Sequence, residues 1–388
     1  MQPKTAVVFE QASFDRVKRN VAGLVSAARG RRRSVDYAAP IPLDVGVELT
    51  TRCNLRCKHC FLWSDSGLYR QSGGFQHRDL SFDVLEKILR ETAPRKSNLF
   101  FWGTEPLVYP QWEALSRRLE NDERWTVVCT NGTLIEKRME SLSRISKNLA
   151  VVVSLDGLQP VHDEMRGEGA FAVVSRNLEH LRAARARGEF RGLITLHAVL
   201  NEKLVPELYD FCLSSEALGV DSLYLGFPWY IGPTTASKMD EFVAEHLGFL
   251  GVSSPGPRSW HTYLHRLDPS LLPTLKTQLE RINGRVWKMR LRLQPALEVD
   301  ELEDFLSGGE RTAQKRMECF AVSNRMDVRA SGTVTACQCY PELIVGDLNT
   351  EGVLDVWRGD RMSQVRRAVA GGLMPVCSKC ILLYLNGR

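Results

Sequence analysis

Short apolar runs alternate with amphipathic stretches over nearly half of this 388-residue chain, from Leu43 to Phe227. This alternation is typical of parallel β-α units, in which each strand is followed by a helix that returns the chain to the same edge of a sheet. Strands are expected at 43–49, 98–102, 125–129, 149–155, 193–199 and 221–227, and helices at 82–92, 111–119, 135–145, 171–187 and 205–218. Six strands with at least five helices predict an α/β fold, a partial (β/α)6 barrel that is open on one side. A flavodoxin-like open sheet is the alternative that the pattern leaves open.

Composition and charge indicate a globular protein with one unusual end. Hydrophobic residues make up 44% of the chain and charged residues 25%, which fits a protein that buries a sizeable core. The formal net charge of +5 arises in residues 1–40, where eight Lys and Arg outnumber three acidic residues. Apolar residues recur there at helical spacing, which predicts an amphipathic helix with a basic face. These apolar residues are Phe14, Val17, Val21, Leu24 and Val25.

The basic segment could bind several kinds of partner, and the sequence of the whole chain reduces their number. A basic helix can contact nucleic acid, a membrane surface or an acidic substrate; we expect neither nucleic acid nor a membrane. No apolar stretch reaches the roughly eighteen residues that span a bilayer, and the N-terminus lacks the apolar core of a secretory signal. We therefore expect a cytoplasmic protein whose ten cysteines serve metal binding or catalysis before disulfides.

Three cysteines follow the first expected strand with the spacing C-x3-C-x2-C. Cys53, Cys57 and Cys60 place three thiolates on one loop. A cubane iron–sulfur cluster has four irons, so three protein ligands leave one iron open to an outside ligand. The alternatives are three unrelated thiols or a zinc knuckle, for which His59 inside the loop would be a fourth ligand.

The triplet resembles the signature of the radical SAM superfamily, in which the amino and carboxylate groups of S-adenosylmethionine occupy the open iron. The resemblance implies a TIM-like partial barrel, a [4Fe–4S] cluster and a flavodoxin- or ferredoxin-type electron donor. It also implies reductive cleavage of S-adenosylmethionine to a 5′-deoxyadenosyl radical, which takes a hydrogen atom from the substrate. In barrels of parallel strands the site lies at the carboxyl ends of the strands, and the triplet falls there.

Polar motifs at the ends of the following strands resemble the family's cofactor contacts. The run 102–107 looks like its Gly-Gly-Glu-Pro turn, with Thr104 in place of the second glycine, and the resemblance implies that Glu105 receives the methionine ammonium. It implies contacts to the ribose and carboxylate from 130–132 and 154–157, Arg166 on the methionine carboxylate, and adenine stacking near 199–200. The expected contact residues are Gly103, Thr104, Glu105, Pro106, Thr130, Asn131, Ser154, Asp156, Arg166, Val199 and Leu200.

Cysteines near the C-terminus form a second set. Cys319 precedes Gly332 and Cys337, and Cys377 and Cys380 form a C-x2-C pair. Four thiolates from separated loops can ligate a second cubane, and a four-cysteine zinc ribbon is the alternative. The arrangement resembles the SPASM and twitch extensions of radical SAM enzymes. Because no cysteine follows Cys380, we expect the shorter twitch type with one auxiliary [4Fe–4S] cluster.

These signals divide the chain into four expected parts. They are a basic extension with an amphipathic helix over 1–40, the barrel over 41–230, a helical connecting region over 231–316 and the auxiliary-cluster domain over 317–388.

The two cysteine sets together suggest a reaction. A fully ligated auxiliary cluster cannot bind S-adenosylmethionine, so it suits electron transfer from a substrate radical. We expect hydrogen abstraction from a C–H bond of a hydroxylated small molecule, such as a sugar, an aminocyclitol or another natural-product intermediate, followed by loss of a proton and an electron. The alternatives are radical epimerisation of a sugar, with Cys339 or Tyr340 as hydrogen or proton donor, and modification of a ribosomal peptide. A zinc- or iron–sulfur-stabilised protein without enzymatic activity is the alternative of another class.

Overall fold

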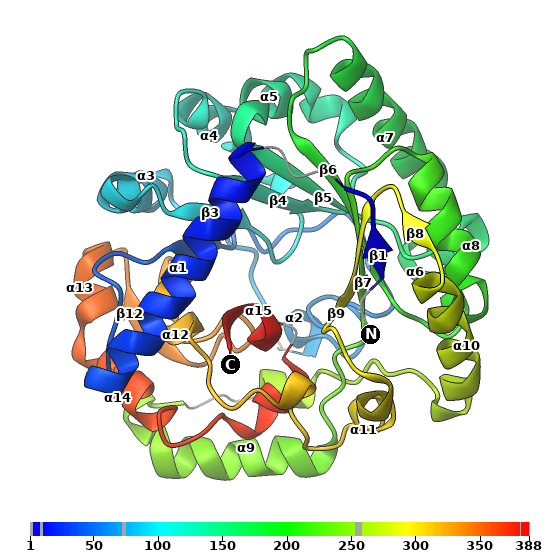
Figure 1. Cartoon of the computed structure of the whole chain (residues 1–388). Coiled ribbons are helices and arrows are strands. Elements are labelled where there is room, and N and C mark those ends of the chain that lie inside the picture. The colour runs from blue at the N-terminus through cyan, green and yellow to red at the C-terminus, as the bar shows by residue number, and fades with distance from the viewer. Residues whose placement is uncertain (1–2, 8–10, 72–74, 253–257, 381, 388) are drawn as a thin grey trace.

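The computed structural model describes residues 3–7, 11–71, 75–252, 258–380 and 382–387. A ten-stranded sheet dominates these residues, and helices cover its outer side (Figure 1). All six expected strands are present, and they pair in chain order as parallel neighbours. They are β2 (Asp44–Val47), β3 (Asn98–Phe101), β4 (Thr126–Thr130), β5 (Leu149–Ser154), β6 (Leu193–Val199) and β7 (Ser222–Gly226).

The sheet is longer than the six strands that the sequence predicts, and it does not close. Strand β9 (Arg290–Gln294) adds to β7, and β10 (Arg325–Val328) adds to β2, both in parallel. An antiparallel continuation through β11 (Thr333–Thr335) and β12 (Ile344–Asp347) forms the far edge. The open barrel is therefore confirmed for the described residues, with β9 and β12 at its two edges.

The outer helices form because their apolar residues recur on one face. In α3 (Phe82–Thr92) the residues Val84, Leu85, Ile88 and Leu89 are buried against the sheet. Burial of such side chains stabilises the fold by roughly 1.5–3 kcal/mol each. The other helices between the strands are α4 (Trp112–Leu119), α5 (Met139–Arg144), α6 (Gln159–Arg166), α7 (Ala170–Ala186) and α8 (Leu204–Ala217).

The segment expected as a helical connecting region also contributes strands. Besides α9 (Pro233–His246), α10 (Leu272–Asn283) and α11 (Leu302–Ser307), it contains β9 and β8 (Val286–Trp287). Strand β8 pairs with β1 (Lys4–Thr5) in a separate two-stranded sheet. The segment therefore contains strands beside the expected helices, and in β9 two buried leucines alternate with half-buried polar residues.

The C-terminal cysteine segment is joined to the barrel through a buried ion pair. Arg329, just after β10, lies with its Nε 3.2 Å from Glu48 Oε2, just after β2, and both side chains are almost fully buried. The Tyr69 hydroxyl donates to Glu48 at 2.6 Å and completes the contact. The remaining helices of this segment are α12 (Ala321–Asn324), α13 (Val353–Arg358), α14 (Asp360–Ala368) and α15 (Leu383–Asn386).

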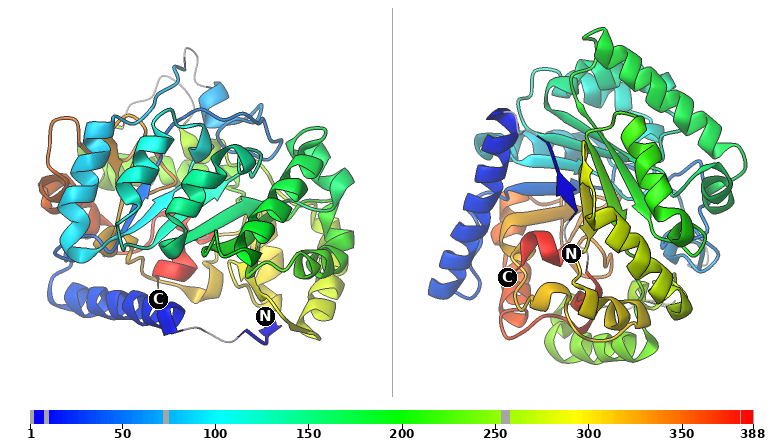
Figure 2. Two further views of the ribbon diagram at one scale, coloured as in Figure 1. Left: turned by 90° about the horizontal axis from the view of Figure 1, so that it is seen from above. Right: turned by 45° about the vertical axis from the view of Figure 1, so that its right-hand side comes forward.

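The expected basic helix is α1 (Gln11–Arg33), and it lies at the amino ends of the strands. Arg19 donates to the main-chain oxygens of Arg95 and Lys96, which precede β3, and the Arg16 guanidinium lies 3.9 Å from the ring centroid of Trp125, before β4. Figure 2 shows α1 on the opposite side of the molecule from α2 (Leu68–Gln71). Within the described residues, every helix is too short or too polar to cross a membrane.

Candidate functional site

The three cysteines of the N-terminal triplet lie in the loop after β2, and each sulfur atom has an N–H group directed at it. Main-chain N–H groups serve two of them, and a guanidinium serves the third. Hydrogen bonds of this kind stabilise thiolate sulfur and tune iron–sulfur clusters. The donors are Leu55 N to Cys53 Sγ at 3.5 Å, Trp63 N to Cys60 Sγ at 3.3 Å and Arg166 Nη1 to Cys57 Sγ at 3.7 Å.

The environment of these thiols fits a bound metal cluster. Burial raises the pKa of Cys53 to about 12 and that of Cys57 to about 11, so these thiols ionise at neutral pH only when a cation holds the thiolates. The negative charges of Glu105 and of the neighbouring thiolates raise the pKa of Cys53 further. Within the described residues, no three His, Cys, Asp or Glu side chains are arranged around a single-ion position.

The turn after β3 directs a buried carboxylate toward the end of β4. Gly103 has a φ of +106°, and a Cβ there would lie 3.0 Å from Glu48 Cγ, so this position requires glycine. Glu105 is fully buried and accepts hydrogen bonds from Thr130 Oγ1 at 2.7 Å and from the main-chain N–H of Asn131 at 2.7 Å. Burial nevertheless raises the pKa of Glu105 to about 7. A cationic ligand beside this carboxylate would favour its ionised form.

The other residues of this turn take structural positions. Thr104, where the resemblance has a glycine, donates its hydroxyl hydrogen to the main-chain oxygen of Thr50 at 2.5 Å. This bond ties the turn to the start of the cysteine loop. Pro106 begins a short 3-10 turn over Pro106–Val108, whose Leu107 N–H donates to the Glu105 side chain at 3.1 Å.

Asp156 and Arg166 form a buried ion pair at the end of β5. Arg166 Nε donates to Asp156 Oδ2 at 2.6 Å, and the Val199 N–H, at the end of β6, donates to Asp156 Oδ1 at 2.9 Å. The Arg166 guanidinium holds the pKa of Asp156 well below its ordinary value in spite of burial, and Asp156 raises the pKa of Arg166. The pair thus fixes a guanidinium between the end of β5 and the Cys57 thiol.

The remaining expected contacts lie at the same edge of the sheet. Ser154, the last residue of β5, pairs in register with His197 of β6. Leu200 is fully buried, and its N–H donates to the main-chain oxygen of Gly226 at 2.8 Å. Asn131 Nδ2 lies 4.0 Å from Cys53 Sγ. The structure therefore brings the cysteine loop and the predicted contact residues together at the carboxyl ends of β2–β6, and their cofactor roles remain predictions.

Two histidines near this edge differ from the sequence analysis: His59 was considered there as a zinc ligand, and His265 was not named. His59 Nε2 lies 3.4 Å from Asp156 Oδ2, so this side chain is engaged with the end of β5. Burial lowers the pKa of His59 to about 4 and keeps its ring neutral. His265, from the segment after β7, stands with its ring centroid 5.6 Å from that of His59. No motif around His265 signals this position, because the segment that carries it has no regular pattern.

The C-terminal cysteines also interact with one another; Cys339 and Cys377 are buried, and Cys319, Cys337 and Cys380 are half-buried. Cys319 interacts electrostatically with Cys380 and Cys337, and the same is true of Cys377. Burial raises the pKa of Cys319 to about 12, while a hydrogen bond from the thiol of Cys339 lowers the pKa of Cys380. Five thiols rather than four therefore meet here. The set suits a polynuclear cluster, and Cys339 is among the candidate ligands.

An aromatic contact chain joins the two cysteine groups. The ring of Phe61, next to Cys60, stacks on Tyr263 with centroids 5.0 Å apart and planes inclined by 18°. Tyr263 makes an edge contact with Tyr340 at 6.2 Å, and Tyr340 follows Cys339 in the chain. Both tyrosines are buried, and the Tyr340 hydroxyl has no hydrogen-bond partner among the described residues. Tyr263, which the sequence did not single out, links the two sites.

Comparison with known families settles the class of the site. Residues 47–212 match the radical SAM superfamily, and residues 319–381 match the SPASM iron–sulfur cluster-binding domain. The chain belongs to the radical SAM superfamily and carries a C-terminal SPASM or twitch domain. The cofactors of such an enzyme are S-adenosylmethionine, a [4Fe–4S] cluster and auxiliary iron–sulfur clusters.

Relatives of this radical SAM enzyme cover different parts of the chain. The pre-heme d1 synthase of Dinoroseobacter shibae is 32% identical over 200 residues, which are 51% of this chain and 46% of that protein. This chain thus matches about half of that relative. The tungsten-containing aldehyde ferredoxin oxidoreductase cofactor-modifying protein of Pyrococcus furiosus is 27% identical over 347 residues, 87% and 86% of the two chains.

A solved structure shares the fold. Streptococcus suis SuiB, in a crystal structure with its precursor peptide SuiA, superposes with a TM-score of 0.57 and 16% sequence identity. The match covers 98% of this chain and 79% of that one. At this identity the likeness concerns the architecture of the barrel and its C-terminal extension.

Proposed function

We propose that this radical SAM enzyme oxidises a C–H bond of a hydroxylated small molecule and delivers the released electron to an auxiliary [4Fe–4S] cluster. One observation carries the first part of the proposal: each sulfur of the triplet Cys53, Cys57 and Cys60 receives an N–H donor within one loop at the carboxyl ends of the strands. When bound, the reduced cluster and S-adenosylmethionine supply a 5′-deoxyadenosyl radical.

The residues around the triplet would position the cofactor. Glu105 would accept the methionine ammonium, since its burial leaves the carboxylate in need of a cation. Arg166 would bind the methionine carboxylate with an N–H that Asp156 and Cys57 do not use, because a guanidinium offers five N–H donors. Asp156 is then a positioning residue, since it acts through Arg166. The main-chain groups near Val199 and Leu200 would face the adenine.

The C-terminal cysteines would hold the cluster that accepts the electron from the substrate radical. Loss of a hydrogen atom from the substrate leaves a carbon radical, and release of one proton and one electron from that radical completes a two-electron oxidation. The electron would reduce the auxiliary cluster held by Cys319, Cys337, Cys377 and Cys380. Tyr263 and Tyr340 line the path between the two cysteine groups.

Two other reactions use the same initiation. In a radical epimerase the substrate radical takes a hydrogen atom back, and Cys339, whose thiol interacts with those of Cys337 and Cys380, or Tyr340 would be the donor. Modification of a ribosomal peptide is the second candidate, because SuiB shares the fold and binds a precursor peptide. In either case we expect a cytoplasmic enzyme reduced by a flavodoxin or ferredoxin. A zinc-stabilised protein without enzymatic activity is the remaining alternative. Zinc in place of iron in the purified protein would support it, and about eight irons per chain would exclude it.

A deuterium experiment tests the proposal and separates these reactions. The anaerobic, reduced enzyme is incubated with S-adenosylmethionine and deuterated hydroxylated metabolites or peptides, and 5′-deoxyadenosine is analysed by mass spectrometry. Deuterium in 5′-deoxyadenosine together with an oxidised product supports the oxidation, whereas an inverted stereocentre without oxidation supports an epimerase. Absence of 5′-deoxyadenosine from protein that holds about eight irons contradicts the proposal.

A further inference from the structure

Helix α1 packs on the protein through small residues and arginines. Gly23 lies so close to Leu43 that a Cβ there would meet its Cδ2 at 2.6 Å, and Ala27 is fully buried. Arg31 reaches inward and donates to the main-chain oxygen of Cys319 at 2.7 Å. The amphipathic helix expected from the sequence is therefore present, and its apolar residues lie on the side away from the protein.

An apolar stripe runs along the outer side of α1. It consists of Phe14, Val17, Val21 and Val25, which recur at intervals of three and four residues and so share one face of the helix. These four residues are between 43% and 53% exposed. Apolar residues at this spacing normally face the core of a domain, so a continuous exposed stripe indicates a surface that binds a partner.

Exposed cations flank and continue the apolar stripe. Lys18 Nζ lies 4.5 Å from the ring centroid of Phe14, and the helical period places Arg29 and Arg32 on the face of the stripe. Arg29, Arg32 and Arg33 are exposed and form no ion pair with any residue that the structure describes. The whole helix contains seven basic residues and one acidic residue. The outer side of α1 therefore fits a partner that is both apolar and negatively charged.

Two other elements on this side of the molecule also expose apolar residues. Helix α15 and strand β1 lie with α1 in front of the sheet in Figure 1 and along the same side in Figure 2. Leu385 of α15 and Val286 of β8, which pairs with β1, are at least half exposed. Apolar residues on three separate elements fit a broad surface better than the groove that recognises a single helix. A second copy of the chain is disfavoured, because it would bring two basic helices together.

We propose that α1 binds the surface of a membrane that contains anionic lipids, with the apolar stripe inserted among the headgroups. Such a helix lies flat in the interface, where apolar burial and attraction between Lys or Arg and anionic lipids both contribute. The proposal differs from the expectation that no membrane takes part, because the sequence did not show that the apolar side of α1 is turned outward. The cysteine loop lies opposite α1, so the site would face the aqueous phase (Figure 2).

Vesicle binding by the iron-containing enzyme tests the proposal. Anaerobically purified protein is sedimented at low ionic strength with vesicles of phosphatidylcholine alone, or of phosphatidylcholine and anionic phosphatidylglycerol in a ratio of three to one. The bound fraction gives a partition coefficient. Val21→Ser/Val25→Ser interrupts the apolar stripe. Leu264→Ser is its control, because Leu264 is 51% exposed and its neighbours Tyr263 and His265 contact the cysteine loop on the opposite side.

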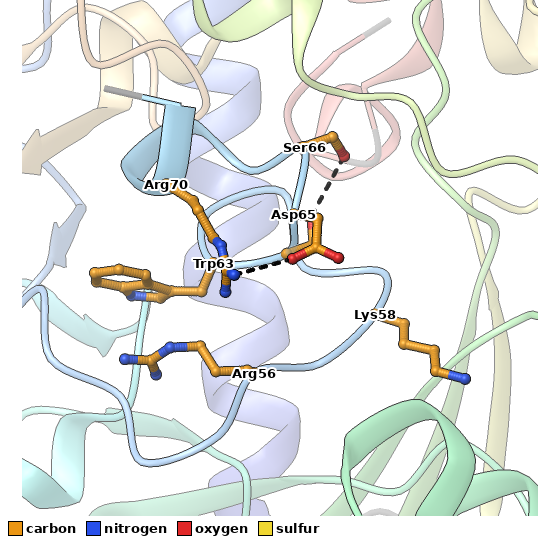
Figure 3. Close-up of a pocket in the computed structure, with 7 residues that line it drawn as sticks. Arg56, Lys58, Trp63, Asp65, Ser66 and Arg70 are labelled. Atoms are coloured by element: carbon orange, nitrogen blue, oxygen red, sulfur yellow. Dashed lines mark hydrogen bonds and ion pairs between the residues drawn. The ribbon is translucent and has the colours of Figure 1, made fainter. Parts of the chain in front are cut away.

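Two further variants remove the same net charge from opposite sides of the molecule. Arg32→Gln/Arg33→Gln removes two exposed cations of α1. Lys58→Gln/Arg70→Gln removes two cations at a pocket beside the cysteine loop, where Figure 3 shows Arg70 paired with Asp65. Melting temperature and iron content are measured for every variant, so that a loss of folding is recognised.

We expect wild type to bind the anionic vesicles and to bind pure phosphatidylcholine much more weakly. The partition coefficient should fall about twentyfold in Arg32→Gln/Arg33→Gln and about tenfold in Val21→Ser/Val25→Ser, and both controls should bind as wild type does. Salt should weaken the binding of wild type. Wild type that stays in solution with anionic vesicles would overturn the proposal, as would an equal loss in the controls. A wild-type dimer in light scattering that Val21→Ser/Val25→Ser abolishes would overturn it in favour of self-association.

Discussion

The hydroxyl of Tyr263 donates a hydrogen bond to the main-chain oxygen of Cys339 over 2.8 Å. Tyr263 comes from the segment that follows β7, and Cys339 from the group of C-terminal thiols. Because Phe61 of the cysteine loop stacks on the same tyrosine ring, one side chain contacts both metal-binding parts of the chain. The segment after β7 therefore contributes a side chain that lies between the two metal-binding parts, in addition to connecting β7 to the elements that follow.

Removal of the Tyr263 hydroxyl tests this link. Tyr263→Phe keeps the ring contacts and loses the hydrogen bond, so we expect a loss of about 1 kcal/mol in stability and a lower melting temperature. Formation of 5′-deoxyadenosine should be retained, because the triplet is untouched. Tyr37→Phe is the control, since its hydroxyl has only a 3.4 Å contact with Ser26 near the surface. Equal melting temperatures for both variants would show that the Tyr263 bond adds nothing.

The two cysteine groups should differ in their effect on cofactor cleavage. Cys57→Ala is expected to lose about four irons per chain and all 5′-deoxyadenosine formation, whereas Cys380→Ala retains some of it. Cys212→Ala is the control, because Cys212 is buried in α8 away from both groups. Iron content and product are measured under anaerobic conditions. Wild-type activity in the Cys57→Ala protein would refute the site assignment.

Loss of the Asp156 carboxylate should release Arg166. Asp156→Asn leaves a buried guanidinium without its anionic partner, which costs about 3–5 kcal/mol, and we expect at least about a tenfold weaker affinity for S-adenosylmethionine. Since the pKa of Asp156 is depressed, the pair is stabilising above the ordinary carboxyl pKa and is lost only at still lower pH. The difference between variant and wild type should thus stay constant from pH 8 to pH 5.

Glu164→Gln is the matched control for that variant. Glu164 lies on α6, the helix that carries Arg166, but its ion pairs with Lys58 and Lys203 are exposed, so their loss should cost less than about 1 kcal/mol. Thermal unfolding and binding titrations measure both variants. The positioning role of Asp156 is disproved if both variants bind S-adenosylmethionine as wild type does.

Glu105 should make the stability of the cofactor-free enzyme depend on pH. Its pKa is about 7 in the folded protein, above the ordinary value of 4.5, so the folded state holds the extra proton. The stabilisation is complete below about pH 4.5 and is lost as pH rises through 7, by about 3 kcal/mol in all. The melting temperature of wild type relative to Glu105→Gln should therefore fall over this range. S-adenosylmethionine should oppose the fall, because its ammonium group favours the carboxylate.

Glu123→Gln serves as the control for this pH dependence. Glu123 is exposed and pairs with Lys96 on the surface, so its replacement should leave the pH profile of wild type intact. A Glu105→Gln profile parallel to that of wild type from pH 5 to pH 8 would show that Glu105 does not titrate in this range.

The strands, the barrel and the cysteine groups could be predicted from the sequence because each has a local signal. The six central strands are apolar runs bounded by helices, and the cysteines have motif spacing. Strand β10 gave no such signal, since Arg325 and Asp327 read as polar surface residues. Their side chains are buried as partners, with Arg325 Nη2 2.8 Å from Asp327 Oδ1, and Arg325 also donates to Gln338 Oε1 at 2.8 Å. Such a compensation depends on contacts that a sequence does not display.

Within the site, the sequence named the residues but not their partners. Asp156 and Arg166 were expected to face the cofactor separately, and the structure pairs them. Thr104 was named among the expected cofactor contacts, and the structure adds that its hydroxyl donates to the main-chain oxygen of Thr50. Tyr263 carries no motif and is placed by long-range packing.

The most direct test of the account is low-temperature paramagnetic resonance of the anaerobic, reduced enzyme before and after addition of S-adenosylmethionine. The account places an open iron on the cluster held by Cys53, Cys57 and Cys60, so the signal of that cluster should change on addition while the auxiliary signal stays the same. A spectrum that S-adenosylmethionine leaves unchanged, in protein with about eight irons per chain, would contradict it.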